Sequence, residues 1–169
     1  MKKTSELLNL MTLLFTVCIF AFVFQSCNEK PKEKEKEPKA AEFSLTTAKT
    51  EIEDANKHFM DLLAKGDSVG LANSYTTDAK VMFTGAPSVV GRENIQKLFS
   101  GIINSGVTAI NLETKEVFGT ADLLAEEGKV TVFVKDNAVA EEKYIILWKK
   151  EDGRWKLFRD IANSNTPAE

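Results

Sequence analysis

The chain has 169 residues and a formal net charge of −3, with 22 basic and 25 acidic side chains. This balance lacks the basic excess that nucleic-acid binding requires, so the sequence predicts no nucleic-acid partner. Two cysteines and one histidine are too few for a typical zinc or iron site, and neither a metal nor another cofactor is expected.

Residues 1–26 have the layout of a secretory signal peptide. Lys2 and Lys3 give a basic start, Leu10–Phe24 is almost entirely apolar, and Cys27 follows this run. The segment resembles a bacterial lipoprotein signal, cleaved before Cys27 so that the thiol carries lipid. The resemblance implies a membrane anchor and a place in the bacterial cell envelope, periplasmic or at the outer membrane. An uncleaved membrane helix and soluble secretion are the alternatives, although an apolar run of about 15 residues is shorter than the roughly 20 that span a bilayer.

Residues 27–42 contain the lipid-bearing cysteine and a charged linker. From Asn28 to Ala41 the segment alternates lysine and glutamate between prolines. Such a segment cannot bury enough apolar surface to offset the entropy of ordering, so it is expected to be a disordered spacer. Residues 43–165 suit one folded domain, and residues 166–169 form a short tail.

Three helices are predicted in the first half of this domain. The first covers residues 47–65, where Ile52, Phe59 and Leu62 recur at helical spacing. A short helix follows over residues 68–75, and a third begins after Gly91 with an apolar stripe from Ile95 to Ile102. A brief strand over residues 81–83 separates the last two helices.

Strands dominate the second half. Residues 110–118, 129–134, 142–150 and 154–161 are rich in β-branched and aromatic side chains. Glu151-Asp152-Gly153 predicts a hairpin turn, and Glu127-Gly128 predicts a break before the second of these strands. Helices followed by an antiparallel run predict an α+β fold, with the helices packed on one face of a curved sheet.

Local signatures accompany this order of elements. They are Ala64–Asp67, Tyr75–Ala79, Gly91–Ile95 and Tyr144–Leu157, with an Arg159-Asp160 pair near the end. The set resembles the cone-shaped fold of nuclear transport factor 2, shared by SnoaL-like cyclases and ketosteroid isomerase, and within it the bacterial branch without assigned function. The resemblance implies an internal cavity and a sheet face that packs on a second subunit, so a homodimer is expected. This fold hosts enzymes, binders and assembly modules, so it does not fix the function.

The resemblance also indicates which catalytic groups are missing. Counted from the shared Gly66-Asp67, the base and two oxyanion donors of the isomerase fall on Phe83, Phe59 and about Ile145, all of them apolar. Proton abstraction by that mechanism is therefore not expected. The dehydratase relative relies on histidines, and the single histidine here, His58, lies on a charged helix face. It is expected to be a surface residue paired with carboxylates.

Asp160 is the sharpest catalytic candidate. Strand alternation gives it one face with Phe158 and Ala162, and registration with the isomerase turns that face into the cavity. A carboxyl group in an apolar pocket has a raised pKa and can act as acid or base. Alternatively, Asp160 pairs with Arg92 or a backbone amide and only fixes the strand. A shift of one residue in side-chain alternation would exchange Asp160 for Arg159.

The remaining candidates would line the cavity. The apolar wall is predicted from Phe59, Tyr75, Phe83, Phe99 and Phe158, with Asn163 orienting a polar end. Aromatic residues at this spacing also form ordinary cores, and Tyr75 suits a packed residue with its hydroxyl bonded. The sequence thus predicts a domain that binds a small, largely apolar molecule. An isomerase, cyclase or hydrolase using Asp160, or a dimerising interaction module without a ligand, are the alternatives.

Overall fold

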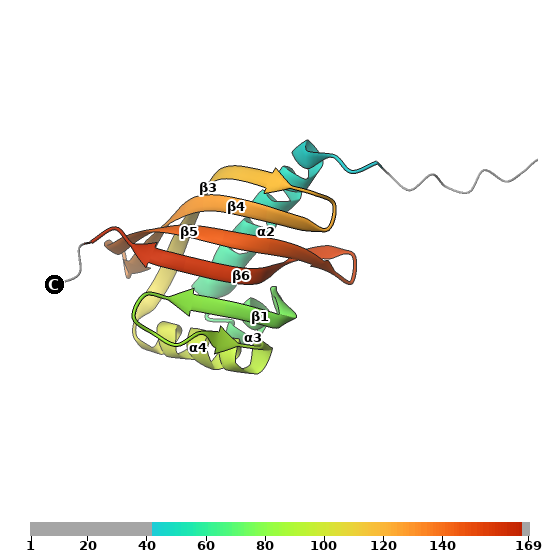
Figure 1. Ribbon diagram of the computed structural model, residues 1–169. Coiled ribbons are helices and arrows are strands. Elements are labelled where there is room, and N and C mark those ends of the chain that lie inside the picture. The colour runs from blue at the N-terminus through green and yellow to red at the C-terminus, as the bar shows by residue number, and fades with distance from the viewer. Residues whose placement is uncertain (1–41, 167–169) are drawn as a thin grey trace, which may run out of the picture. The chain divides into compact units, whose positions relative to one another are not determined.

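The computed structural model describes residues 42–166, in which helices precede a large sheet (Figure 1). The predicted signal segment, the lipid site Cys27, the charged linker and all but the first residue of the tail lie outside the described residues, and they stay predictions. None of the helices between residues 42 and 166 combines the length and the hydropathy of a membrane span.

The three helices begin and end where local chemistry dictates. Helix α2 (Leu45–Ala64) begins after Ser44, whose side chain accepts a hydrogen bond from a backbone N–H of the first turn. Helix α3 (Ser68–Asn73) is capped in the same way by Asp67. Helix α4 (Arg92–Asn104) follows Gly91, whose φ of 81° suits glycine. These helices confirm the predicted ones, except that Tyr75 belongs to the following strand.

Six strands form one mixed sheet. They are β1 (Tyr75–Phe83), β2 (Val89–Val90), β3 (Val107–Gly119), β4 (Leu123–Val134), β5 (Asn137–Glu151) and β6 (Arg154–Ser164). Their order is β2-β1-β6-β5-β4-β3, and neighbours are antiparallel except for β1 and β6, which run parallel. In Figure 1, α2 crosses one face of the long strands while α3 and α4 lie beside β1. The predicted α+β class is confirmed, with the parallel pair as an addition.

The predicted break at Glu127-Gly128 is wrong. Strand β4 runs without interruption through both residues, and Gly128 pairs with Tyr144 of β5. A Cβ atom on Gly128 would lie 2.2 Å from the ring of Tyr144. The glycine therefore marks a close approach of an aromatic ring to the backbone, which is the other common reason for glycine within a strand.

The core lies between the helices and one face of the sheet, called here the inner face. Its largest fully buried apolar side chains are Trp148, Tyr75, Ile52, Leu71 and Ile95. They come from α2, α3, α4, β1 and β5, so a single core holds all the elements together. Buried polar side chains interrupt this core at one place, where the candidate site begins.

Candidate functional site

A carboxylate lies at the centre of the core. The side chain of Glu126, on β4, is fully buried and receives four hydrogen bonds. Its Oε1 accepts from Asn56 Nδ2 and Thr114 Oγ1, each at 2.7 Å, and from the Tyr144 hydroxyl at 2.8 Å. Its Oε2 accepts from Trp148 Nε1 at 2.9 Å. We call Glu126 and these four donors the Glu126 cluster.

The Glu126 cluster is almost completely satisfied. A buried charge is tolerated only when hydrogen bonds replace its hydration, and an ionised carboxylate can accept from all four donors at once. One atom is left over: Asn56 Oδ1 is the single buried side-chain oxygen or nitrogen without a partner in the described part of the chain. The cluster ties α2, β3, β4 and β5 together, so it orients Trp148 as well as stabilising the fold.

A second carboxylate of the inner face belongs to Asp160. Its Oδ2 accepts a hydrogen bond of 2.7 Å from the Tyr75 hydroxyl, and its neighbours across the sheet are the buried Val81 and Ile146. The pKa of Asp160 is raised to about 6, chiefly by burial; the Tyr75 hydrogen bond lowers it, and nearby Glu126 and Glu142 add to the rise. The predicted inward orientation of Asp160 is thus confirmed.

The alternative in which Asp160 pairs with Arg92 is wrong. Arg92 instead donates from Nε to the backbone oxygen of Tyr75 at 2.8 Å and forms an ion pair with Glu151. The hydroxyl of Tyr75 is bonded, as expected for a packed core residue. Burial and the adjacent Asp160 carboxylate raise the pKa of this hydroxyl well above its ordinary value, so Tyr75 acts here as a donor.

The predicted wall residues divide into two groups. Phe59, Tyr75 and Phe99 are buried together, with ring centroids 5.5–6.0 Å apart. Phe83 pairs with the buried Ala162 but lies at the end of β1 and remains 37% exposed. Whether any of these rings touches a ligand stays a prediction.

Two of the predicted positions are corrected by the strand register. A shift between Leu147 and Trp148 inserts one extra residue into β6, so that Leu157 and Asp160 both face inward. Phe158 instead packs against cations, with the Arg159 guanidinium carbon 3.6 Å from its ring centroid. Its predicted place on the face of Asp160 is therefore wrong.

Asn163 also lies away from the predicted cavity. It pairs with the exposed Lys143, opposite in alternation to the buried Ala162, and its Oδ1 accepts from Thr84 Oγ1 at 2.9 Å. Ile145, the position counted for the second oxyanion donor, is likewise on the outer face and 38% exposed. The inward positions beside it belong to Tyr144 and Ile146.

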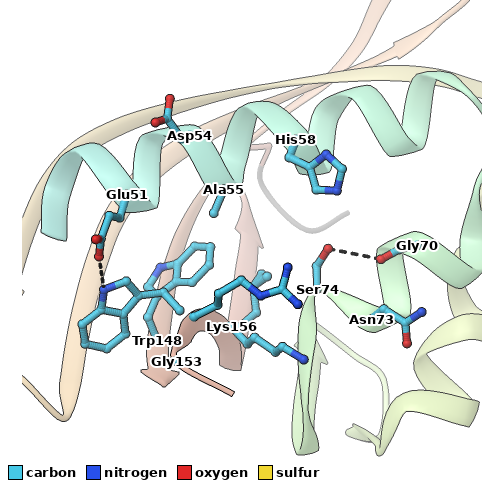
Figure 2. A pocket seen from close by; sticks show the side chains of 13 residues that line it. Glu51, Asp54, Ala55, His58, Gly70, Asn73, Ser74, Trp148, Gly153 and Lys156 are labelled. Atoms are coloured by element: carbon cyan, nitrogen blue, oxygen red, sulfur yellow. Dashed lines mark hydrogen bonds between the residues drawn. The ribbon is translucent and has the colours of Figure 1, made fainter. Parts of the chain in front are cut away.

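An open pocket lies at one end of the molecule, between α2, the end of α3 and the turn that joins β5 to β6 (Figure 2). Its volume is about 700 Å³. The residues that line it are Glu51, Asp54, Ala55, His58, Gly70, Asn73, Ser74, Trp148, Gly153, Arg154, Trp155, Lys156 and Leu157. We call this space the two-tryptophan pocket; none of the predicted site residues lines it.

Both tryptophans of the chain contribute to this pocket. Trp148 is held by its hydrogen bond to Glu126, and Trp155 donates from Nε1 to Glu51 Oε2 at 2.9 Å, as Figure 2 shows. Each indole N–H is therefore bonded, which leaves the apolar rings to form a wall. Because both rings are also buried, this wall is rigid.

The hairpin turn between β5 and β6, beside the pocket, is held in place by its backbone conformation and by the contacts of Glu151. Asp152 and Gly153 have φ angles of 54° and 74°, as a tight two-residue hairpin turn requires. Glu151, just before the turn, accepts a hydrogen bond of 2.9 Å from the backbone N–H of Thr77 and pairs with Arg92 and Lys156. The backbone hydrogen bond contributes most to lowering the pKa of Glu151 to about 2, and both cations add to it.

Three basic side chains line the pocket: His58, Arg154 and Lys156. In Figure 2 the ring of His58 lies on the pocket side of α2, and the residue is exposed, as predicted. Over residues 42–166 no ion pair joins it to a carboxylate, so the predicted pairing is absent there. In the same range, His, Cys, Asp and Glu side chains form no group of three or more that could hold a metal ion.

Comparison with known proteins places these features in a family. The model of the SnoaL-like domain matches residues 56–158. A search of curated proteins found no match.

Solved structures share the fold. A ketosteroid isomerase-like protein from Erwinia carotovora atroseptica is 23% identical, with a TM-score of 0.58 over 70% of this chain and 96% of its own. An NTF2-like protein with a cystatin-like fold from Novosphingobium aromaticivorans is 14% identical, with a TM-score of 0.64 over 73% and 86%. A protein from Catenulispora acidiphila, solved in complex with S-DNPA, is 14% identical, with a TM-score of 0.62 over 71% and 95%. At these identities the likeness concerns the fold.

Proposed function

The chain belongs to the family of SnoaL-like domains, and we propose that it binds a small molecule in the two-tryptophan pocket. The observation that supports this proposal is the pairing of an open space of about 700 Å³ with two indole rings whose polar edges are already bonded. This size is within the range of small-molecule sites, which combine an apolar wall with a few polar groups.

The pocket favours a ligand with a mainly apolar body. Trp148, Trp155 and Leu157 line the pocket with no more than 7% of each residue exposed, so they form a rigid apolar base and lose little freedom when a ligand binds. Ser74 and Asn73 at the opposite side can donate or accept hydrogen bonds and so orient a polar end. The ligand class predicted from the sequence is retained, while its place moves from the face of Asp160 to the end of the molecule.

Native mass spectrometry of the protein purified from its own source tests this proposal. We expect a co-purifying molecule that is lost when Ala55→Phe places a ring inside the pocket. Ala64→Phe is the matched control, because Ala64 lies on the same helix, is exposed and does not line the pocket. A molecule retained by Ala55→Phe, or a protein that carries nothing and shows no tryptophan fluorescence change with any flat apolar compound, would contradict it.

One observation favours a second candidate function, catalysis by Asp160. Its carboxyl has a pKa of about 6 and a bonded tyrosine partner, so it could exchange a proton close to neutral pH. Asp160 does not line the two-tryptophan pocket, so the two functions are separable. A turnover that persists unchanged in a folded Asp160→Asn protein would exclude this candidate.

We also propose that lipid on Cys27 tethers the domain to the bacterial cell envelope, as the signal pattern suggests. The replacement Cys27→Ser should move the protein from the membrane fraction to the soluble fraction of a cell lysate. Retention of the variant in the membrane fraction would instead favour an uncleaved helical anchor.

Self-association through the outer face of the sheet is a further proposal. Ile145 and Ile161 are cross-strand neighbours there and are 38% and 39% exposed. Light scattering at several protein concentrations should give the mass of a dimer, and Ile161→Lys should shift it to that of a monomer. A monomer at every concentration would contradict the proposal.

A further inference from the structure

We infer that the ligand of the two-tryptophan pocket is an organic anion, such as an aromatic carboxylate or sulfonate, whose charge is received by Arg154. This inference rests on the proposed function and adds the chemical class of the ligand. It is drawn from the charges that line the pocket and from which of them already have partners.

Two acidic side chains, Glu51 and Asp54, line the pocket from α2. Glu51 accepts the N–H of Trp155 at the edge of the pocket, so one of its oxygens is already engaged. Asp54 extends from α2 on the side away from the pocket, as Figure 2 shows. Both residues line the pocket, but the carboxylate of Asp54 points away from it, so Glu51 is the acidic group close to the tryptophans.

The basic side chains differ in their partners. Lys156 is bound to Glu151 at 3.3 Å, with 13% of its side chain exposed, so its charge is largely matched. The side chain of Arg154 has no hydrogen bond or ion pair to another described residue, in contrast to that of Arg92, which is bound by Glu151. It therefore presents an unmatched positive charge to the pocket.

The chemistry of Arg154 fits an oxyanion beside a flat ring. A guanidinium group is planar, always charged in proteins, and donates two parallel hydrogen bonds to a carboxylate or sulfonate. Arg154 and Trp155 both line the pocket, so an acid attached to an apolar group bound in this space can meet the guanidinium of Arg154. His58, on the other side of the pocket, can donate a further hydrogen bond from α2.

Two fluorescent probes of nearly the same shape test the charge preference. 1-Anilinonaphthalene-8-sulfonate is an anion, and N-phenyl-1-naphthylamine is its neutral counterpart. Energy transfer from the two tryptophans to the probe reports binding to the protein, and its loss in Ala55→Phe assigns that binding to the pocket. Titrations use the wild-type protein and the variants Arg154→Gln, Lys57→Gln and Ala55→Phe. Lys57 is the charge-matched control, since it is exposed on α2 and does not line the pocket.

We expect the anion to bind about tenfold more tightly than the neutral probe, and Arg154→Gln to remove this difference, as the loss of one charge-assisted hydrogen bond would. Lys57→Gln should keep the difference and Ala55→Phe should abolish binding of both probes. Equal binding of the two probes, or a preference unchanged in Arg154→Gln, would overturn the anion inference while leaving the proposed function intact. No energy transfer with either probe, or transfer unchanged in Ala55→Phe, would overturn both.

Discussion

Replacement of Asp160 by asparagine should make the protein more stable at neutral pH. Asparagine has nearly the same shape, and its side-chain oxygen can still accept the hydrogen bond of the Tyr75 hydroxyl. It cannot ionise, however, and burial is the main reason that ionisation of Asp160 is unfavourable. The variant therefore keeps the contact and removes the cost of the buried charge.

The size of the effect follows from the pKa. The folded protein raises the pKa of Asp160 from 3.8 to about 6. Each pKa unit corresponds to about 1.36 kcal/mol, so the ionised carboxylate costs about 3 kcal/mol in the folded state relative to the unfolded chain. This cost is absent below the unfolded pKa, where both states hold the proton. It grows as the pH rises through the window between the two pKa values and is complete above the folded one.

Urea denaturation, followed by the fluorescence of Trp148 and Trp155, measures this cost between about pH 4 and pH 8. The wild-type free energy of unfolding should fall by about 2–2.5 kcal/mol more than that of Asp160→Asn over this window, because a small part of the cost is already present at pH 4. The exposed Asp61, replaced in the same way, is the control and should leave the profile unchanged. Glu151 contributes in the opposite sense and at lower pH, because its pKa of about 2 means that its stabilisation is lost only as the pH falls below 4.5. Parallel profiles for wild type and Asp160→Asn would refute the assigned burial of Asp160.

Two further predictions concern the Glu126 cluster. Gly128→Ala places a methyl group against the ring of Tyr144 and should lower the free energy of unfolding by about 1–3 kcal/mol. The control Gly101→Ala, in an open part of α4, should raise it by about 0.5–1 kcal/mol. Equal effects of the two substitutions in thermal denaturation would contradict the close approach at Gly128. Glu126→Gln turns an amide N–H toward the indole N–H of Trp148 or leaves other donors without an acceptor. The substitution should therefore lower the free energy of unfolding by about 1–3 kcal/mol and shift the tryptophan emission. A variant as stable as wild type would show that the four hydrogen bonds make no net contribution to stability.

The helices and most strands could be predicted because one face of each is buried. In α2 the buried residues recur at helical spacing, and Ser44 and Gly66 lie just outside the two ends. The six-stranded sheet could be predicted only in part, because the parallel contact between β1 and β6 joins segments that are far apart in the sequence. No local pattern encodes such a pairing.

The Glu126 cluster escaped prediction for a specific reason. Leu124, Glu126, Gly128 and Val130 alternate on the inner face of β4, and a lone acid in such a row is a signal of a buried, bonded carboxylate. The row was interpreted as interrupted at Gly128, because glycine more often marks the end of a strand than a place where an aromatic ring approaches the backbone. Only the position of Tyr144 across the sheet distinguishes the two meanings.

The site at the end of the molecule depends on one extra residue in β6. The two-residue turn at Asp152-Gly153 pairs Trp148 with Leu157 and sets the pocket side of the hairpin. Continued without interruption, the same register would pair Asp160 with Ile145 and turn its carboxylate to the outer face. The bulge at Phe158 advances β6 by one residue, so that Asp160 faces Ile146 inside. The turn thus positions the tryptophans and the bulge positions the carboxylate. Because alternation alone predicts one face for the whole strand, it could place either group correctly but not both.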